Sequence, residues 1–158
     1  MRNPLKIGLG FGLTSGIITT LGTIIGLNAA TQSKTAVIGG ILTVALADAF
    51  SDALAIHITE ESTGNHDSSY LWKATFSTFF FKMVFALSFV LPFLVLEYGL
   101  AILVCLVWAT LVIGIFSFIT AKKREESAIK AVLEHLIVGG LVVGATQIVG
   151  SVISTVFP

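Results

Sequence analysis

The sequence is poor in charged residues, and that shortage excludes an ordinary soluble fold. Only 11% of the 158 residues are Asp, Glu, Lys or Arg, whereas 55% are hydrophobic. A typical soluble domain carries about 25% charged residues, and a soluble fold of this size exposes much of its surface to water. A bilayer is itself an apolar solvent and removes that conflict. We therefore expect an integral membrane protein whose main partner is the lipid bilayer.

Several signals of function are also missing. Cys105 is the sole cysteine, so one chain can form neither a disulfide nor a site with several thiolate ligands. The formal net charge is zero, which gives no indication of a nucleic-acid partner. No Walker-type loop, zinc-protease helix motif or nucleophile elbow is present. Nothing in the sequence therefore indicates an enzyme.

Long apolar runs are what the sequence has in abundance. A helix that crosses a bilayer needs about 20 mostly apolar residues, and it satisfies its own backbone hydrogen bonds in lipid. The alternating segments of about ten residues that a membrane β-barrel requires are absent. We predict one all-α domain over residues 1–158 with five transmembrane helices. The expected spans are residues 7–30, 35–58, 73–96, 100–121 and 131–157.

Basic residues flank these spans unequally. Only Lys34 lies on one side of the expected membrane, and the other side carries Arg2, Lys6, Lys73, Lys122, Lys123, Arg124 and Lys130. Since short cytoplasmic loops are rich in Lys and Arg, we expect a cytoplasmic N-terminus and an external C-terminus. The first apolar run has no convincing cleavage site, so we expect no removal of a signal peptide. The absence of a targeting extension indicates a prokaryotic plasma membrane.

Two acidic residues inside the second span carry the strongest chemical signal. Asp48 and Asp52 are four residues apart and therefore share one face of a helix. Two ionised carboxylates in an apolar helix repel each other, so they must share a proton, pair with a cation or bind a metal. Lys82 in the third span is an available ion-pair partner, but one lysine cannot neutralise two aspartates. The pattern favours a cation site or proton relay and leaves a structural ion pair as the alternative.

A second group of candidate metal ligands follows near the cytoplasmic end of the same helix. His57, Glu60 and Glu61 share one face, and imidazole with carboxylates suits Mn²⁺, Fe²⁺ or Zn²⁺. This face points almost opposite to the two aspartates, so the groups form one site only if the helix unwinds or a second protomer contributes. A solvated helix end is the alternative interpretation.

Small and bulky residues predict how the spans pack. The first span carries glycines at four-residue spacing, and the fifth is also rich in glycine, so we expect these two helices to cross closely. The third span is rich in phenylalanine and is expected to face lipid, with Pro92 kinking or ending it. The glycines are Gly8, Gly12, Gly16, Gly22 and Gly26 in the first span and Gly139, Gly140, Gly144 and Gly150 in the fifth.

Three stretches together resemble the vacuolar iron transporter family. They are GLTSGIITT at 12–20, ADAFSDALAIHIT at 47–59 and the glycine-rich IVGGLVVGAT at 137–146. The chain departs from the family at three positions: Ser15 replaces an aspartate, Asp52 replaces the metal-binding methionine, and Ile56 replaces a glutamate. The long metal-collecting helices that the family has between spans two and three are reduced here to a short loop.

The resemblance implies a homodimer that exports Fe²⁺ or Mn²⁺ from the cytosol while protons move inward. The divalent metal ion is then a substrate, and no cofactor is permanently bound. Asp52 and Ser15 would line the path with Asp48 nearby, and His57, Glu60 and Glu61 would gather cations at the cytoplasmic mouth. A carboxylate in place of a thioether makes the site harder, which favours Mn²⁺, Mg²⁺ or Ca²⁺.

Two other functions remain open at this stage. One is a membrane protein without transport activity, in which Asp48 or Asp52 pairs with Lys82 to hold the bundle together and the loop binds a partner. The other is a channel, or a transporter for a small organic cation.

Overall fold

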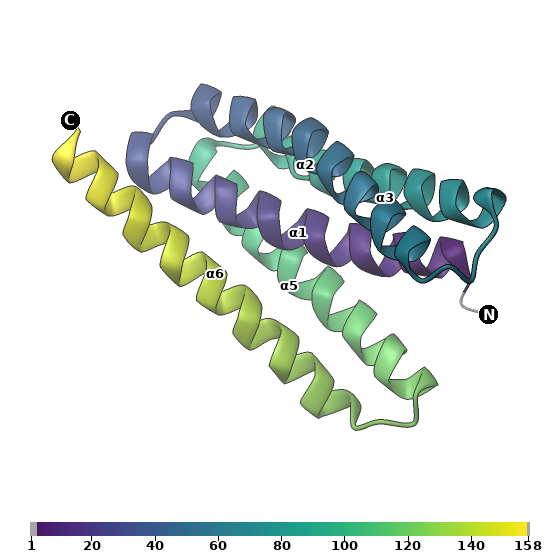
Figure 1. The fold of residues 1–158 in the computed structure, drawn as a ribbon. Coiled ribbons are helices and arrows are strands. Elements are labelled where there is room, and N and C mark those ends of the chain that lie inside the picture. The colour runs from purple at the N-terminus through teal and green to yellow at the C-terminus, as the bar shows by residue number, and fades with distance from the viewer. Residues whose placement is uncertain (1–2, 158) are drawn as a thin grey trace.

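The computed structural model describes residues 3–157 as a bundle of long helices with no strand in that range (Figure 1). The elements are α1 (Pro4–Thr31), α2 (Lys34–Ser62), α3 (Ser68–Ser88), α4 (Val90–Val95), α5 (Tyr98–Lys123) and α6 (Ala128–Val156). The short α4 continues α3, and together they form the span Ser68–Val95. Five helices of the described part are thus long and apolar enough to cross a membrane, which confirms the predicted fold class.

Side-chain caps extend most helices a few residues beyond the predicted spans. Asn3 accepts a hydrogen bond from the backbone N–H of Leu5 and thereby starts α1 at Pro4. Asp67 accepts one from the backbone N–H of Tyr70 and starts α3. Such caps satisfy backbone donors that the first turn of a helix leaves free. As a result, the connection between α2 and α3 shrinks to residues 63–67.

The break between α3 and α4 lies three residues before Pro92. The N–H of Phe89 bonds to the carbonyl of Ala86 at 3.2 Å, one residue nearer in the chain than in a regular α-helix. A proline inside a helix has no N–H to donate and its ring crowds the carbonyl four residues earlier, here that of Ser88. Of the two effects predicted for Pro92, the structure shows a local break in the helix, and the span continues past it to Val95.

Helix α1 lies at the centre of the bundle and contacts α2, α3, α5 and α6 (Figure 1). The predicted close crossing of the first and fifth spans is confirmed, since α1 contacts α6 and a Cβ on Gly150 would collide with the carbonyl oxygen of Gly26 and with the Cβ of Ala29. Gly12 faces α3 instead, where an added Cβ would lie 2.9 Å from the backbone nitrogen of Lys82. Glycine thus allows α1 to approach helices on two sides.

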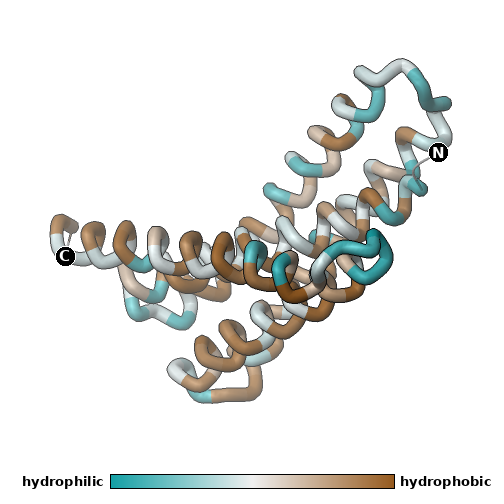
Figure 2. The backbone as a smooth tube through the Cα atoms, turned by 90° about the horizontal axis from the view of Figure 1, so that it is seen from below, coloured by the Kyte–Doolittle hydropathy of each residue, from teal (hydrophilic) through white to brown (hydrophobic). Residues whose placement is uncertain are grey.

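The outer surface is apolar along the helices. Figure 2 shows hydrophobic residues along the helix shafts, while hydrophilic residues gather mainly at the connections. Helix α6 buries only Gly150 among its residues, and the aromatic rings of Phe76 and Phe80 on α3 are more than 60% exposed. Lipid is the solvent in which such a surface is stable.

The described basic residues other than the buried Lys82 lie toward the two ends of the bundle, divided between them as predicted. The start of α1 and the α2–α3 and α5–α6 connections lie toward the right of Figure 1, and the end of α6 lies toward the left. Lys34, at the start of α2, belongs to the left-hand end. Arg2 lies outside the described residues, and the remaining basic residues of the larger group are Lys6, Lys73, Lys122, Lys123, Arg124 and Lys130.

Candidate functional site

Four polar residues from three helices meet inside the bundle. Lys82 of α3 lies between the two aspartates of α2, with its Nζ 2.6 Å from Oδ2 of Asp48 and in direct contact with Oδ2 of Asp52. Ser15 of α1 donates a hydrogen bond to the same Asp52 oxygen at 2.8 Å, and its Oγ accepts one from Lys82 Nζ at 2.8 Å. We call Ser15, Asp48, Asp52 and Lys82 the Asp–Lys cluster. The structure therefore brings together three of the predicted site residues and the predicted ion-pair partner.

Glycines of α1 make room for the lysine. A Cβ on Gly16 would lie 3.4 Å from Cγ of Lys82, and one on Gly12 would lie 2.9 Å from its backbone nitrogen. The aliphatic stem of Lys82 can therefore lie directly along α1, and only 1% of its side chain is exposed. Lysine stems often cover apolar surface while the ammonium finds a polar partner, and here that partner is the pair of aspartates.

The charges of the cluster do not cancel. With all three groups ionised, two carboxylates and one ammonium carry a formal charge of minus one. The side chain of Asp52 is 17% exposed and that of Asp48 is 31% exposed, so Asp48 is the more open of the two. Its Oδ2 is buried and contacts Lys82 without hydrogen-bond geometry. An uncompensated charge inside a membrane protein is costly, so the cluster has the means to attract one further cation or proton.

An open groove of about 460 Å³ reaches Asp48 from the side of α1 and α2. The hydroxyl of Thr19 donates to the carbonyl of Ser15 at 2.8 Å, and that of Thr23 donates to the carbonyl of Thr19 at 2.9 Å. Both hydroxyls thus bond back to the backbone of their own helix, and their oxygen lone pairs remain available as acceptors. The groove is lined by Thr19, Thr23, Thr43, Val44, Ala47, Asp48 and Ser51.

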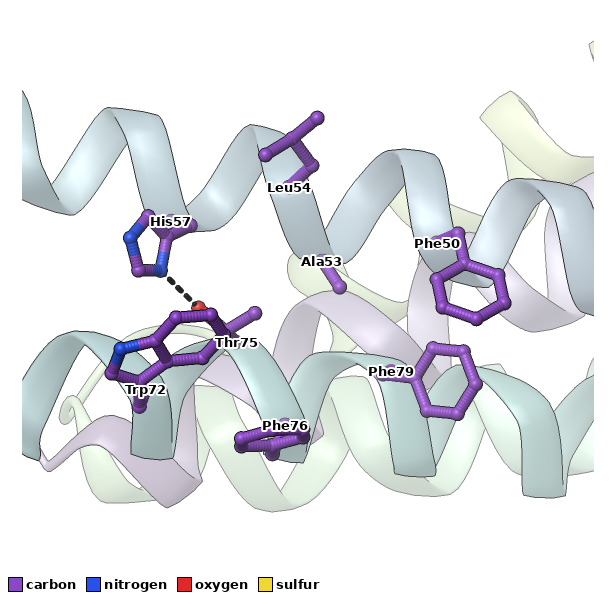
Figure 3. Close-up of a pocket in the computed structure, with 8 residues that line it drawn as sticks. All are labelled: Phe50, Ala53, Leu54, His57, Trp72, Thr75, Phe76 and Phe79. Atoms are coloured by element: carbon purple, nitrogen blue, oxygen red, sulfur yellow. Dashed lines mark hydrogen bonds between the residues drawn. The ribbon is translucent and has the colours of Figure 1, made fainter.

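The second group of predicted ligands is not assembled into one site. His57 lies 2.8 Å from Thr75 through its Nδ1, and its ring packs 4.8 Å from that of Trp72 (Figure 3). Glu60 instead contacts Nε2 of His66 at 3.4 Å, and Glu61 is exposed. Within residues 3–157, no group of three or more His, Cys, Asp or Glu side chains is placed to hold a metal ion.

Figure 3 shows that His57 borders an apolar cavity between α2 and α3. The cavity has a volume of about 430 Å³, and its lining includes the rings of Phe50 and Phe79, which lie 4.7 Å apart. Thr75 donates its own hydroxyl hydrogen to the carbonyl of Leu71 at 2.8 Å. With that hydrogen engaged, His57 is the donor toward Thr75. This bond could not be predicted from the sequence, because it depends on how α2 lies against α3.

A contact between His66 and Glu60 also links the α2–α3 connection to the end of α2, and it was not predicted from the sequence. The His66 ring stacks on Tyr70 with 3.8 Å between centroids, and Glu60 is only 9% exposed. The contact closes the turn between α2 and α3. Only the turn geometry reveals it, since the two residues lie on different segments.

Comparison with known proteins found a match to one protein family. The sequence model of the VIT family matches residues 51–151, which is more than half of the chain. This range includes Asp52 and Lys82, whereas Asp48 and Ser15 lie before it. No curated protein and no solved structure matched the chain.

Proposed function

Because this chain belongs to the VIT family, we propose that it is a transporter of divalent metal cations and that Asp48, Asp52 and Ser15 line its intramembrane site. The family suggests metal-ion transport in general. The five apolar spans support a location in a membrane. The choice of ion, the coupling and the residues are our proposal.

The excess of carboxylates over ammonium groups in the Asp–Lys cluster is the observation that carries the proposal. A purely structural ion pair needs one carboxylate for each ammonium, but Lys82 faces two. The second carboxylate gives the cluster a formal charge of minus one, and its more exposed member, Asp48, borders the open groove. Charged groups inside a membrane most often serve an ion path or a proton relay.

The ligand atoms favour a hard cation. Two carboxylates and a hydroxyl offer only oxygen, which suits Mn²⁺, Mg²⁺ and Ca²⁺ better than soft ions. We place Mn²⁺ first because it fits both these oxygen ligands and the iron and manganese substrates that the family resemblance implies, with Fe²⁺ second.

The proposed direction is export from the cytosol in exchange for protons. The resemblance implies this direction, and a carboxylate that releases a cation can take up a proton in its place. The basic end of the bundle would then lie in the cytoplasm. Glu60 and Glu61, at the same end of α2, would attract cations toward the membrane.

We further propose a homodimer in which a second copy covers the groove between α1 and α2. Hydroxyl-bearing side chains such as Thr43 and Ser51 line that groove on the outside of one chain. Polar side chains in a span are more stable against another helix than against lipid. Covering the groove would also enclose Asp48, as an ion path requires.

A second function is favoured by one specific observation, the near-complete burial of Lys82, whose side chain is only 1% exposed. In that alternative the protein transports nothing and the ion pair holds α2 and α3 together. The alternative predicts that Lys82→Ala misfolds and that Asp48→Ala or Asp52→Ala in the same chain restores folding. Loss of Lys82 would also leave buried carboxylates without a partner in a transporter. The prediction that distinguishes the alternative is therefore the absence of cation flux through folded wild-type protein.

Flux into liposomes that contain purified protein tests the proposal. Fe²⁺, Mn²⁺, Zn²⁺, Mg²⁺ and Ca²⁺ are compared with and without a pH gradient, using wild type, Asp52→Asn and the control Glu97→Gln. Glu97 is an exposed acid before α5, and its side chain makes no cap hydrogen bond. We expect proton-driven flux that Asp52→Asn abolishes and Glu97→Gln preserves. No flux of any of these ions from folded wild type contradicts the proposal.

A further inference from the structure

The ammonium of Lys82 lies among three oxygen atoms that could otherwise coordinate a metal. They are Oδ2 of Asp48, Oδ2 of Asp52 and Oγ of Ser15, the first and third at 2.6 and 2.8 Å from Nζ. Carboxylate and hydroxyl oxygens are also the ligands of hard divalent cations. The lysine therefore holds the place of a cation in this structure.

We propose that Lys82 is a tethered competitor of the transported cation and sets the preference of the site for divalent ions. The inference rests on the proposed function, because it concerns the same site. A divalent cation and the ammonium cannot both use these oxygens at close range, since like charges repel strongly where the dielectric constant is low. The metal binds when Lys82 moves away.

The Lys82 ammonium and a metal ion would reach the aspartates by different routes. Lys82 reaches the aspartates from α3, and its stem lies against Gly16 of α1. The groove lined by Thr19 and Thr43 also reaches Asp48, and Lys82 is not among the residues that line it. A metal ion entering by the groove would meet Asp48 first. The flexible four-carbon stem of lysine allows the ammonium to withdraw while the metal takes over its oxygens.

This competition explains how a site made only of oxygen can reject Na⁺ and K⁺. A monovalent ion has no more charge than the ammonium that it must displace. The lysine is also held beside the site by its own chain, which gives it a high effective concentration. A divalent ion gains about twice the attraction to the two carboxylates. Lys82 is thus a specificity-determining residue rather than a ligand.

The inference makes opposite predictions for two substitutions. Lys82→Gln removes the competing charge, so Mn²⁺ should bind at least about tenfold more tightly, as expected when the competent state of the free site is populated below about 10%. Na⁺ should then compete with Mn²⁺, whereas we expect no such competition in wild type. Lys82→Arg keeps the charge and grips carboxylates through two parallel hydrogen bonds, so Mn²⁺ should bind several-fold more weakly.

The test measures Mn²⁺ binding to purified full-length protein in detergent by loss of the electron paramagnetic resonance signal of free Mn²⁺, with and without excess Na⁺. Wild type, Lys82→Gln, Lys82→Arg and Asp52→Asn are compared with the control Lys73→Gln, an exposed lysine on the same helix. Size-exclusion chromatography checks folding. We expect Lys73→Gln to bind as wild type does.

The outcomes separate this inference from the proposed function. If Mn²⁺ binds wild type in an Asp52-dependent manner but Lys82→Gln binds no more tightly, Lys82 is not a competitor and the inference is wrong. If Lys82→Gln does not fold, Lys82→Arg decides, because affinity equal to or above that of wild type overturns the inference. If wild type and every folded variant, Lys82→Gln included, bind no Mn²⁺, both the proposed function and the inference fail.

Discussion

Lys82 Nζ lies 2.6 Å from Oδ2 of Asp48, although the lysine side chain is almost fully buried and the aspartate side chain is about one-third exposed. The ion pair thus connects the buried interior of the bundle, where Lys82 lies, to the partly exposed surface at Asp48. Asp52 receives the same ammonium and also the hydroxyl of Ser15, so it is the better satisfied of the two carboxylates. Because the two carboxylates differ in this way, we expect the loss of Asp48 and the loss of Lys82 to have different effects.

Asp48→Asn should preserve the fold and abolish transport. The change leaves Lys82 paired with Asp52, so the cluster becomes neutral and no buried charge loses its partner. The extra negative charge that attracts a cation is gone, so we expect metal affinity to fall at least about tenfold, a loss of about 1.4 kcal/mol or more, and metal flux to be lost. Flux into liposomes measures the effect against Glu97→Gln. Flux at the wild-type level would refute a role for Asp48 in the path.

Lys82→Ala should destabilise the protein strongly. Removing one partner of a buried ion pair costs about 3–5 kcal/mol, because the remaining charge stays buried without compensation. Here two carboxylates lose the same ammonium. Chemical unfolding in detergent micelles measures the free energy of unfolding, and adding Asp52→Ala should recover part of the loss. Lys73→Ala, at an exposed position, should change stability by no more than about 0.5 kcal/mol.

Gly12→Ala should separate α1 from α3 and disturb the cluster. The added Cβ would lie 2.9 Å from the backbone nitrogen of Lys82 and from the carbonyl oxygen of Thr78, and backbone atoms cannot rotate away. Overpacking of this kind costs about 1–3 kcal/mol. The matched control is Gly39→Ala on α2, where no atom lies within 4 Å of the new Cβ. Thermal unfolding should distinguish them, and equal stability of the two variants would contradict the close packing.

Thr75→Val should lower stability without affecting transport. Valine matches the shape of threonine but cannot accept the hydrogen bond from His57, so about 1 kcal/mol is expected to be lost. Thr110→Val is the control, since Thr110 also bonds back to its own helix but is exposed. A large loss of Mn²⁺ flux in Thr75→Val, with the fold retained, would show instead that the orientation of His57 serves the ion path.

More of the Asp–Lys cluster than of the second group of candidate ligands could be predicted from the sequence. Asp48, Asp52 and Lys82 could be anticipated because charges in apolar spans are rare and must find partners. The sequence could not show that one lysine contacts both aspartates, since that depends on how far α3 approaches α1 at Gly12 and Gly16. The face formed by His57, Glu60 and Glu61 was correct as a helical pattern. The structure divides it, because neighbouring segments offer Thr75 and His66 as partners.

The sequence by itself determined the membrane class, the five spans and the face that Asp48 and Asp52 share. These follow from the length of the apolar runs and from the helical repeat, which are local properties of the chain. The family resemblance placed Ser15 along the same path as Asp52, but only the tertiary structure decided that the Ser15 hydroxyl donates to Asp52 and that Lys82 contacts both aspartates. Such contacts join different helices, and their geometry depends on how closely the glycine faces allow those helices to pack.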